Sequence, residues 1–200
     1  MRLSPGWAWF AGLVAVTAAL ALTVSVTAAQ AATITVTTTA QGVDDDAECS
    51  LQEAIYAANL DAAKAPDPAH LADPNAFIAT GCVAGSGDDV IVLPTKATFT
   101  MSGPVADVYN YVGATATPMV TTTIVIEANG SKIQHGGGPV PYRAFAVGEG
   151  GDLTLHEIHV RGFEVHGGNG GGGGGGGLGA GGAIYVQNGT LAVGWSTFEQ

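Results

Sequence analysis

Six carboxylates are the side chains in this 200-residue sequence whose types and spacing come nearest to a site for chemistry. They are Asp44, Asp45, Asp46, Glu48, Asp88 and Asp89. Oxygen ligands that cluster within a short loop suit Ca²⁺. Both groups lie in polar, glycine-containing segments that are typical of turns, and a solvated acidic turn is the simpler interpretation. We therefore regard the six residues as weak calcium candidates and predict no other metal site.

Basic side chains that would complete a catalytic site are isolated in the sequence. Arg143 and Arg161 could act as bases or hold a substrate, but no carboxylate cluster accompanies them, so we expect single surface arginines. His156 and His159 flank Ile158, which we expect to point inward, so both rings should face solvent. Their spacing is not that of a zinc site. We predict no catalytic residue and no cofactor, with calcium as the one ion that the carboxylates allow.

The charge balance argues against two classes of partner. The formal net charge is −11, and the few lysine and arginine residues are scattered singly. A nucleic-acid surface needs clustered positive charge to displace counterions, and an acidic, lysine-poor surface does not favour binding to anionic lipid. We therefore expect neither nucleic acid nor a lipid surface as the partner.

Residues 1–31 have the pattern of an export signal. Arg2 precedes an apolar run, and Ala29-Gln30-Ala31 matches an A-x-A cleavage site. The apolar run approaches the length that spans a bilayer, so an uncleaved anchor is the alternative. Small residues dominate the second half of the run and favour cleavage. We expect a mature chain without a membrane span, either secreted or held at the cell surface.

The two cysteines, Cys49 and Cys82, bracket a stretch that contains Pro66, Pro68 and Pro74 and that we expect to be irregular. An even number of cysteines in an exported chain favours a disulfide. A long loop without regular structure also needs such a constraint. Two free buried thiols are the alternative, and metal binding by only two cysteines fits the sequence less well.

One helix is expected, from Cys49 to Asn59. Ser50 is a favoured N-cap, and Glu53 completes a capping box. An apolar stripe at helical spacing follows; its members are Leu51, Ala54, Ile55 and Ala58. We expect this stripe to cap the end of a sheet, the opposite face to lie in solvent, and Asn59 to end the helix in the left-handed conformation.

Short apolar segments recur after Cys82, at intervals of roughly 20 residues once the glycine tract is discounted. They lie at 90–93, 122–126, 145–147, 153–155, 184–186 and 191–193. The last two units share one order: strand, glycine-containing turn, strand, polar break, strand. Repeats of this kind favour an all-β solenoid of stacked parallel strands. A β-sandwich, which also uses short strands and regular turns, is the alternative.

These features divide the chain into three parts. Residues 1–31 are the signal, residues 32–86 hold the first strand, the helix and the disulfide-closed loop, and residues 87–200 hold the stacked coils. A flexible glycine-rich loop is expected at 167–182. Because the sequence stops within the repeat pattern, we expect an array of coils that is incomplete at its C-terminus.

The segment Cys49-Ser-Leu-Gln-Glu-Ala-Ile-Tyr-Ala-Ala-Asn59, preceded by a threonine-rich strand at 34–39, resembles the CSLREA motif. This motif opens many bacterial secreted or surface proteins, usually ahead of right-handed parallel β-helix repeats of the pectin-lyase-like type. The segments at 87–94, 124–130 and 181–186 are similar to those that follow the motif in such proteins. Gln52 stands where the motif has Arg, so any salt bridge made by that Arg is missing here.

The resemblance implies a right-handed parallel β-helix with an N-terminal capping helix, in an exported bacterial protein that is non-catalytic and has a structural or adhesin-like role. It identifies no partner; an extracellular carbohydrate and the surface of a host or neighbouring cell are both compatible with it. The alternative is a carbohydrate-active β-helix enzyme, of the polysaccharide lyase or hydrolase type, or a carbohydrate-binding module. A lyase needs carboxylate-bound calcium and a base, and its site would lie outside these residues.

Overall fold

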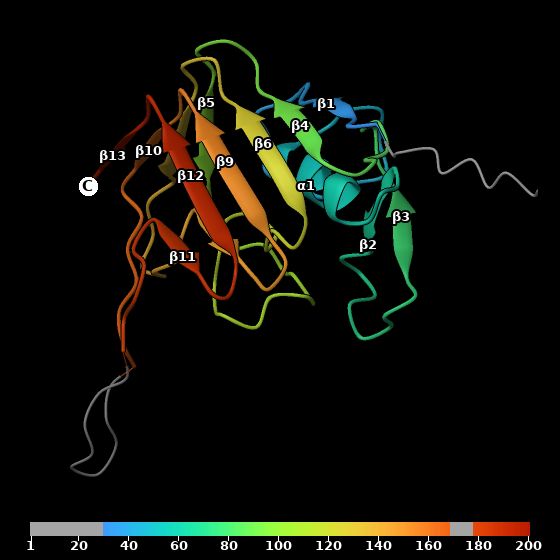
Figure 1. Cartoon of the computed structure of the whole chain (residues 1–200). Coiled ribbons are helices and arrows are strands. Elements are labelled where there is room, and N and C mark those ends of the chain that lie inside the picture. The colour runs from blue at the N-terminus through green and yellow to red at the C-terminus, as the bar shows by residue number, and fades with distance from the viewer. Residues whose placement is uncertain (1–29, 169–177) are drawn as a thin grey trace, which may run out of the picture.

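The largest sheet is built from strands that are far apart in the sequence. The computed structural model describes residues 30–168 and 178–200, and in it five strands lie in the order β1, β4, β6, β9, β12 (Figure 1). Every neighbouring pair in this sheet is parallel. The strands are β1 (Thr33–Thr35), β4 (Asp89–Val92), β6 (Thr123–Glu127), β9 (Asp152–His156) and β12 (Thr190–Gly194).

Two further parallel sheets are formed in the same way. One has the order β13, β10, β7, β5, and the other pairs β11 with β8. Their strands are β5 (Thr98–Met101), β7 (Lys132–His135), β8 (Phe145–Val147), β10 (His159–Arg161), β11 (Ile184–Val186) and β13 (Thr197–Glu199). The expected β-rich architecture is confirmed, and the parallel pairing differs from the antiparallel sheets of a β-sandwich.

From β6 onward the chain visits the three sheets in a fixed order. It passes through β6, β7 and β8, then β9, β10 and β11, then β12 and β13. The two units expected from the sequence correspond to β8–β10 and β11–β13. Each unit therefore adds one strand to each sheet. The described residues do not cover most of the expected signal or of the glycine-rich loop.

The core consists of columns of apolar side chains that run across the sheets. The strand register places Ile34, Ile91, Ile126, Leu155 and Val193 opposite one another. The first four are fully buried, whereas Val193, on the edge strand, is 45% exposed. Side chains alternate between the two faces of a strand, so the residues between these positions point away from the core. The apolar alternation in the sequence thus becomes one continuous interior.

The segment between Cys49 and Cys82 is more regular than expected. Strand β2 (Lys64–Pro66) pairs with β3 (Phe77–Ala79) in an antiparallel ribbon. The amine of Lys64 lies 4.0 Å from the centre of the Phe77 ring. Strands of three residues with a proline at one end are too short to produce an alternation pattern, which explains why the sequence indicated an irregular loop.

Helix α1 spans Leu51–Asn59 and begins as expected. The Ser50 hydroxyl accepts a hydrogen bond from the Glu53 amide at 3.2 Å, and Glu53 Oε2 accepts one from the Ser50 amide at 2.8 Å. Both halves of the capping box are therefore present. The four residues of the predicted apolar stripe are buried, and the helix packs against β1, β2 and β4. It lies at the β1 end of the large sheet (Figure 1).

The expectation of a solvent-facing side on α1 is wrong. Gln52, Glu53 and Tyr56 are also buried. Gln52 and Tyr56 meet the segment 102–119, whereas the Glu53 carboxylate accepts from the amides of Asp44 and Ser50. Gln52 donates to the carbonyl oxygen of Ala116 at 3.0 Å, and the Tyr56 hydroxyl donates to Asp107 Oδ1 at 3.2 Å. The helix is thus a core element with polar residues that have specific partners.

The expected left-handed end at Asn59 is also wrong. The C-cap is Leu60 in the right-handed conformation, and the left-handed residue is Asp61, with φ of 47°. The Asn59 side chain instead donates to the carbonyl oxygen of Met119 at 2.8 Å and accepts from the Thr121 amide at 2.9 Å. Its side chain joins the helix to a distant segment.

The disulfide expected between Cys49 and Cys82 is present and closes a sequence separation of 33 residues. Free thiols are therefore excluded. The bond ties the residue before the N-cap of α1 to the chain between β3 and β4. Within residues 30–168 and 178–200, no helix is long and apolar enough to cross a membrane.

Candidate functional site

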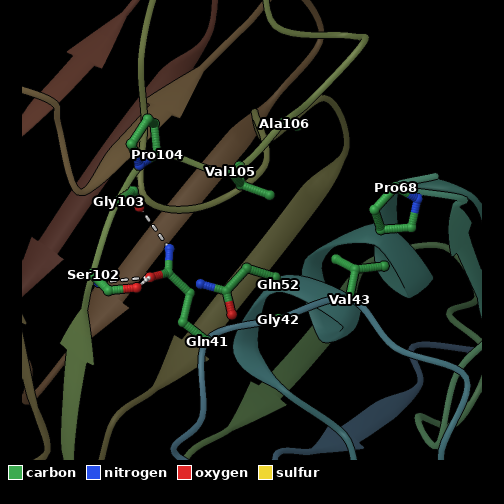
Figure 2. A pocket seen from close by; sticks show the side chains of 10 residues that line it. All are labelled: Gln41, Gly42, Val43, Gln52, Pro68, Ser102, Gly103, Pro104, Val105 and Ala106. Carbon is green, nitrogen blue, oxygen red and sulfur yellow. Dashed lines mark hydrogen bonds between the residues drawn. The ribbon is translucent and has the colours of Figure 1, made fainter. Parts of the chain in front are cut away.

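The pocket beside the N-terminus of α1 is a candidate site for a small neutral ligand. It has a volume of about 220 Å³, smaller than the ~300–1,000 Å³ that is common for ligand pockets. Its ten lining residues, shown in Figure 2, are all uncharged. They are Gln41, Gly42, Val43, Gln52, Pro68, Ser102, Gly103, Pro104, Val105 and Ala106.

Gln41 joins the two segments that form this pocket. Its amide nitrogen donates to the carbonyl oxygen of Gly103 at 2.7 Å, and its Oε1 accepts from the Ser102 amide at 2.7 Å (Figure 2). The Ser102 hydroxyl also donates to Oε1, at 3.1 Å. The Gln41 side chain therefore provides hydrogen-bond partners for two backbone groups just after β5, where the chain leaves its sheet. This role was not apparent from the sequence, because the partners lie 61 and 62 residues away.

Gln52 is the lining residue with a buried side-chain oxygen that has no hydrogen-bond partner within residues 30–168 and 178–200. Its side chain is fully buried, and its amide nitrogen contacts the carbonyl oxygen of Ala116 and, at 3.4 Å, the sulfur of Met101. Its Oε1 has no hydrogen-bond donor among the described residues. A buried acceptor without a partner costs about 1–3 kcal/mol. This oxygen is buried behind the pocket surface, so a pocket occupant would reach it only after the wall shifts.

The first group of calcium candidates forms an exposed turn. Asp44, Asp45, Asp46 and Glu48 are all exposed. Asp46 Oδ1 accepts from the Glu48 amide at 2.8 Å, and Glu53 Oε1 accepts from the Asp44 amide at 2.9 Å. Both contacts order the turn that leads into α1. In the described part of the chain, no group of three or more His, Cys, Asp or Glu side chains is placed to hold a metal ion.

The second group of candidates is split between two environments. Asp88 is exposed, whereas Asp89 is fully buried at the start of β4. Asp89 Oδ1 accepts from the amides of Ala32 and Ser86, at 3.1 and 2.8 Å, while its Oδ2 has no partner among the described residues. Burial is the largest effect on the Asp89 carboxyl and raises its pKa. Asp89 thus anchors Ala32, the residue that precedes β1, to the start of β4.

Arg143 is not the surface residue that the sequence suggested. Only 8% of it is exposed, and its guanidinium donates to the carbonyl oxygen of Ala180 from Nε and Nη2, at 3.0 and 2.9 Å. Nη1 donates to the carbonyl oxygen of Val112 at 3.1 Å, and the group lies 5.0 Å from the Tyr185 ring centre. Burial lowers the pKa of Arg143. The N–H groups of the Arg143 guanidinium are therefore bonded to backbone carbonyl oxygens.

The other basic residues occupy the surface positions that were expected. Ile158 is buried, while His156 is exposed and His159 is half-buried. His156 Nδ1 lies 3.0 Å from Glu127 Oε1, and Arg161 lies 4.0 Å from Glu199 in an exposed pair. Exposed ion pairs of this kind contribute little to stability.

The pair of buried Tyr56 and half-buried Asp107 was not predicted from the sequence. Asp107 accepts from the Tyr56 hydroxyl and from the amides of Tyr109 and Met119. Burial is the main cause that raises the pKa of both side chains, strongly for Tyr56. The pair holds the segment 105–119 over α1. Its partners are 51 residues apart, so no local pattern could have indicated it.

Comparison with known protein families, curated proteins and solved structures finds no match to this chain. The resemblance to the CSLREA motif therefore stays a prediction from the sequence, and function has to be argued from the residues themselves.

Proposed function

We propose that this chain is an exported, non-catalytic bacterial protein with a structural or adhesin-like role, built as a right-handed parallel β-helix with α1 as its N-terminal cap. The observation that carries the proposal is the recurring order of strands. Each turn of the chain from β6 to β13 adds one strand to each sheet, in parallel. A coil of this kind, repeated along one axis, gives a rigid rod with long lateral surfaces.

The handedness of the proposed coil follows from a general rule. Connections between parallel strands of one sheet are right-handed in nearly all proteins. β4, β6, β9 and β12 are such strands, and each connection between them contributes a strand to at least one other sheet. The cap is supported by the burial of α1 at the β1 end, where apolar side chains would otherwise meet water.

Export is supported by two independent features. The pattern of residues 1–31 is that of a secretion signal, and the Cys49–Cys82 disulfide is typical of proteins that fold in an oxidising compartment. A cytosolic protein of this type would keep both thiols reduced. The two features favour the secreted or surface location that the sequence predicted.

A non-catalytic role is supported because the residues that could have formed a lyase site bond to backbone groups instead. Arg143 bonds to backbone carbonyl groups, and Asp89 holds two backbone amides. The exposed acidic turn at 44–48 lies next to the start of α1, where Asp46 and Glu53 accept from its backbone amides. A lyase needs a base and a calcium-binding cluster on one surface, and these side chains are engaged elsewhere.

The direct test is an assay of the purified protein on polygalacturonate and alginate, with and without calcium, beside a known lyase as positive control. We expect no unsaturated product above the blank under either condition. Calcium-dependent formation of unsaturated uronides would contradict the proposal. An Asp88→Asn, Asp89→Asn variant would then show whether the second acidic group is responsible.

Carbohydrate binding without catalysis is the second candidate, and the pocket of Figure 2 favours it. A neutral cavity lined by glutamine and proline side chains fits a hydroxylated neutral ring better than a charged ligand. Titration with neutral monosaccharides, followed by NMR of the amides of Ser102 and Gly103, tests it. Saturable shifts that Gln52→Leu removes would support this second candidate, and shifts that persist in the variant would contradict it.

A further inference from the structure

Trp195 is the most exposed large apolar side chain of the sheets and their connections. It lies between β12 and β13, and 91% of it is in contact with solvent. Its backbone adopts the left-handed conformation, with φ of 55°. This conformation is disfavoured for a bulky residue, and Asn or Gly would adopt it more readily. Neither the exposure nor the backbone conformation is explained by the packing of the core.

Trp195 lies at a bend that recurs along the chain. The corresponding bends of the preceding turns hold Lys96, Asn129 and Glu157, with φ of 53°, 52° and 52°. Backbone hydrogen bonds link these bends: the Lys96 amide donates to Asn129, and the Glu157 amide donates to Gly194. Glu157 has a neighbouring coil on both sides and is still exposed. Asn129 at the same bend is half-buried, and its side chain donates to the carbonyl oxygen of Leu93. The longer side chain of Glu157 shows that a residue at this bend can stay in solvent between two neighbouring bends.

A pocket of about 330 Å³ lies against Trp195. Its other lining residues are Glu127, His156, Glu157 and Gly194. The register of β6, β9 and β12 places Glu127, His156 and Gly194 in one row. A Cβ atom at Gly194 would lie 2.9 Å from the exposed His156 ring and would displace it. The glycine thus leaves the space that the pocket occupies.

The charges around this pocket are negative. Glu127 is paired with His156, whereas the carboxylate of Glu157 has no ion-pair partner among the residues that the structure describes. No lysine or arginine lines the pocket. The net charge of −11 adds an attractive field for cations. An indole ring beside a carboxylate without an ion-pair partner is the combination that binds organic cations.

We propose that Trp195, Glu157 and Glu127 bind an ammonium group. The ring face of Trp195 supplies a cation–π contact, and the carboxylates supply the opposing charge. The ammonium group belongs either to a small quaternary compound or to a lysine side chain of a partner. Exposed cation–π contacts are weak, so one such site gives low affinity and repeated contacts on a partner would strengthen the binding.

The test uses the full chain with Trp7→Phe and Trp9→Phe, which leaves Trp195 as the single indole of the three tryptophans. Its fluorescence and its indole N–H signal are followed during titration with tetramethylammonium chloride and with N-acetyl-lysine amide. Sodium chloride at equal ionic strength and the neutral isostere 3,3-dimethylbutan-1-ol are the controls. We expect saturable changes with an ammonium probe and not with either control. The probe that binds more tightly identifies the source of the group.

Glu157→Gln should weaken the binding roughly two- to fivefold, as expected for loss of one exposed charge contact. Glu149→Gln, an exposed carboxylate outside the pocket, should leave it unchanged. Equal response to the neutral isostere would overturn the proposal and indicate a merely apolar surface. Equal affinity in Glu157→Gln and in the parent protein, or no saturable response to either ammonium probe, would also overturn it.

Discussion

The side-chain amides of Gln41 and Gln52 donate hydrogen bonds to the same acceptor, the carbonyl oxygen of Ala116, at 3.3 and 3.0 Å. The two nitrogens converge, and this arrangement leaves Gln52 Oε1 without a donor. The shared acceptor ties the acidic turn, helix α1 and the chain after β5 together. The pocket of Figure 2 is the space that remains between these segments.

Two substitutions of Gln52 should affect stability differently, because one removes the side-chain amide and the other replaces its nitrogen with an oxygen. Gln52→Leu removes the unpartnered oxygen, and Ala116 keeps the bond from Gln41, so we expect the free energy of unfolding to change by less than about 1 kcal/mol. Gln52→Glu places a second oxygen against the Ala116 carbonyl group and should cost about 2 kcal/mol or more at neutral pH. Urea unfolding measures both. Equal losses for the two variants would contradict this view of the site.

Removal of the disulfide should destabilise the N-terminal part of the fold. For a loop of this length, chain entropy gives a stabilisation of about 4 kcal/mol from the Cys49–Cys82 bond. We expect Cys49→Ala, Cys82→Ala to lower the free energy of unfolding by this order, and hydrogen exchange to increase first in α1 and in β2–β3. The parent protein under reducing conditions is the matched comparison. An unchanged urea midpoint in both would show that the cap is held without the bond.

Truncation of Ile55 should show that α1 belongs to the core. Ile55 is fully buried, and Ile55→Ala should cost about 2–5 kcal/mol. Val83, which is 60% exposed and next to Cys82, is the control, and Val83→Ala should change stability by less than about 0.5 kcal/mol. Thermal or urea unfolding measures the difference. Similar small effects at both sites would mean that α1 contributes little to the packed structure.

Asp89 should make the protein less stable as the pH rises. Burial raises its pKa in the folded state, so the folded protein holds a proton that the unfolded chain has already released. The stabilisation from protonated Asp89 is present at low pH and is lost as the pH rises through the folded-state pKa. Asp89→Asn removes this loss and keeps an acceptor for the Ala32 and Ser86 amides.

We therefore expect Asp89→Asn to raise the free energy of unfolding by about 1 kcal/mol near neutral pH and to have a smaller effect at about pH 3.5. Urea unfolding at both pH values gives the comparison. Asp107 also has a raised pKa and stays in both proteins, so only the difference between variant and parent is informative. A difference that shrinks as the pH rises would be contrary to this assignment.

The parts of the structure that were predictable depend on local signals. The capping box of Ser50 and Glu53 is a pattern of four consecutive residues, and it is present as expected. The strands were indicated by apolar alternation, and the disulfide by cysteine number and an export signal. Each of these signals acts over a few residues or depends on composition, so it can be recognised without knowledge of the fold.

The parts that were missed depend on contacts between distant segments. The burial of Gln52 follows from a partner 64 residues away, and that of Arg143 from Ala180, 37 residues away. Polar type and helical position made Gln52 and Tyr56 look solvent-facing, but the segment 102–119 covers them. The pocket of Figure 2 forms only where these segments meet, so no pattern in the sequence could indicate it.

The most direct test of the account is the intact mass of the protein recovered after expression in a bacterium with its own residues 1–31. We predict that the chain recovered outside the cytoplasm begins at Ala32 and is two hydrogen atoms lighter than its sequence, because Cys49 and Cys82 are joined. Recovery of the uncleaved chain from the cytoplasm with two free thiols would contradict the proposed exported β-helix.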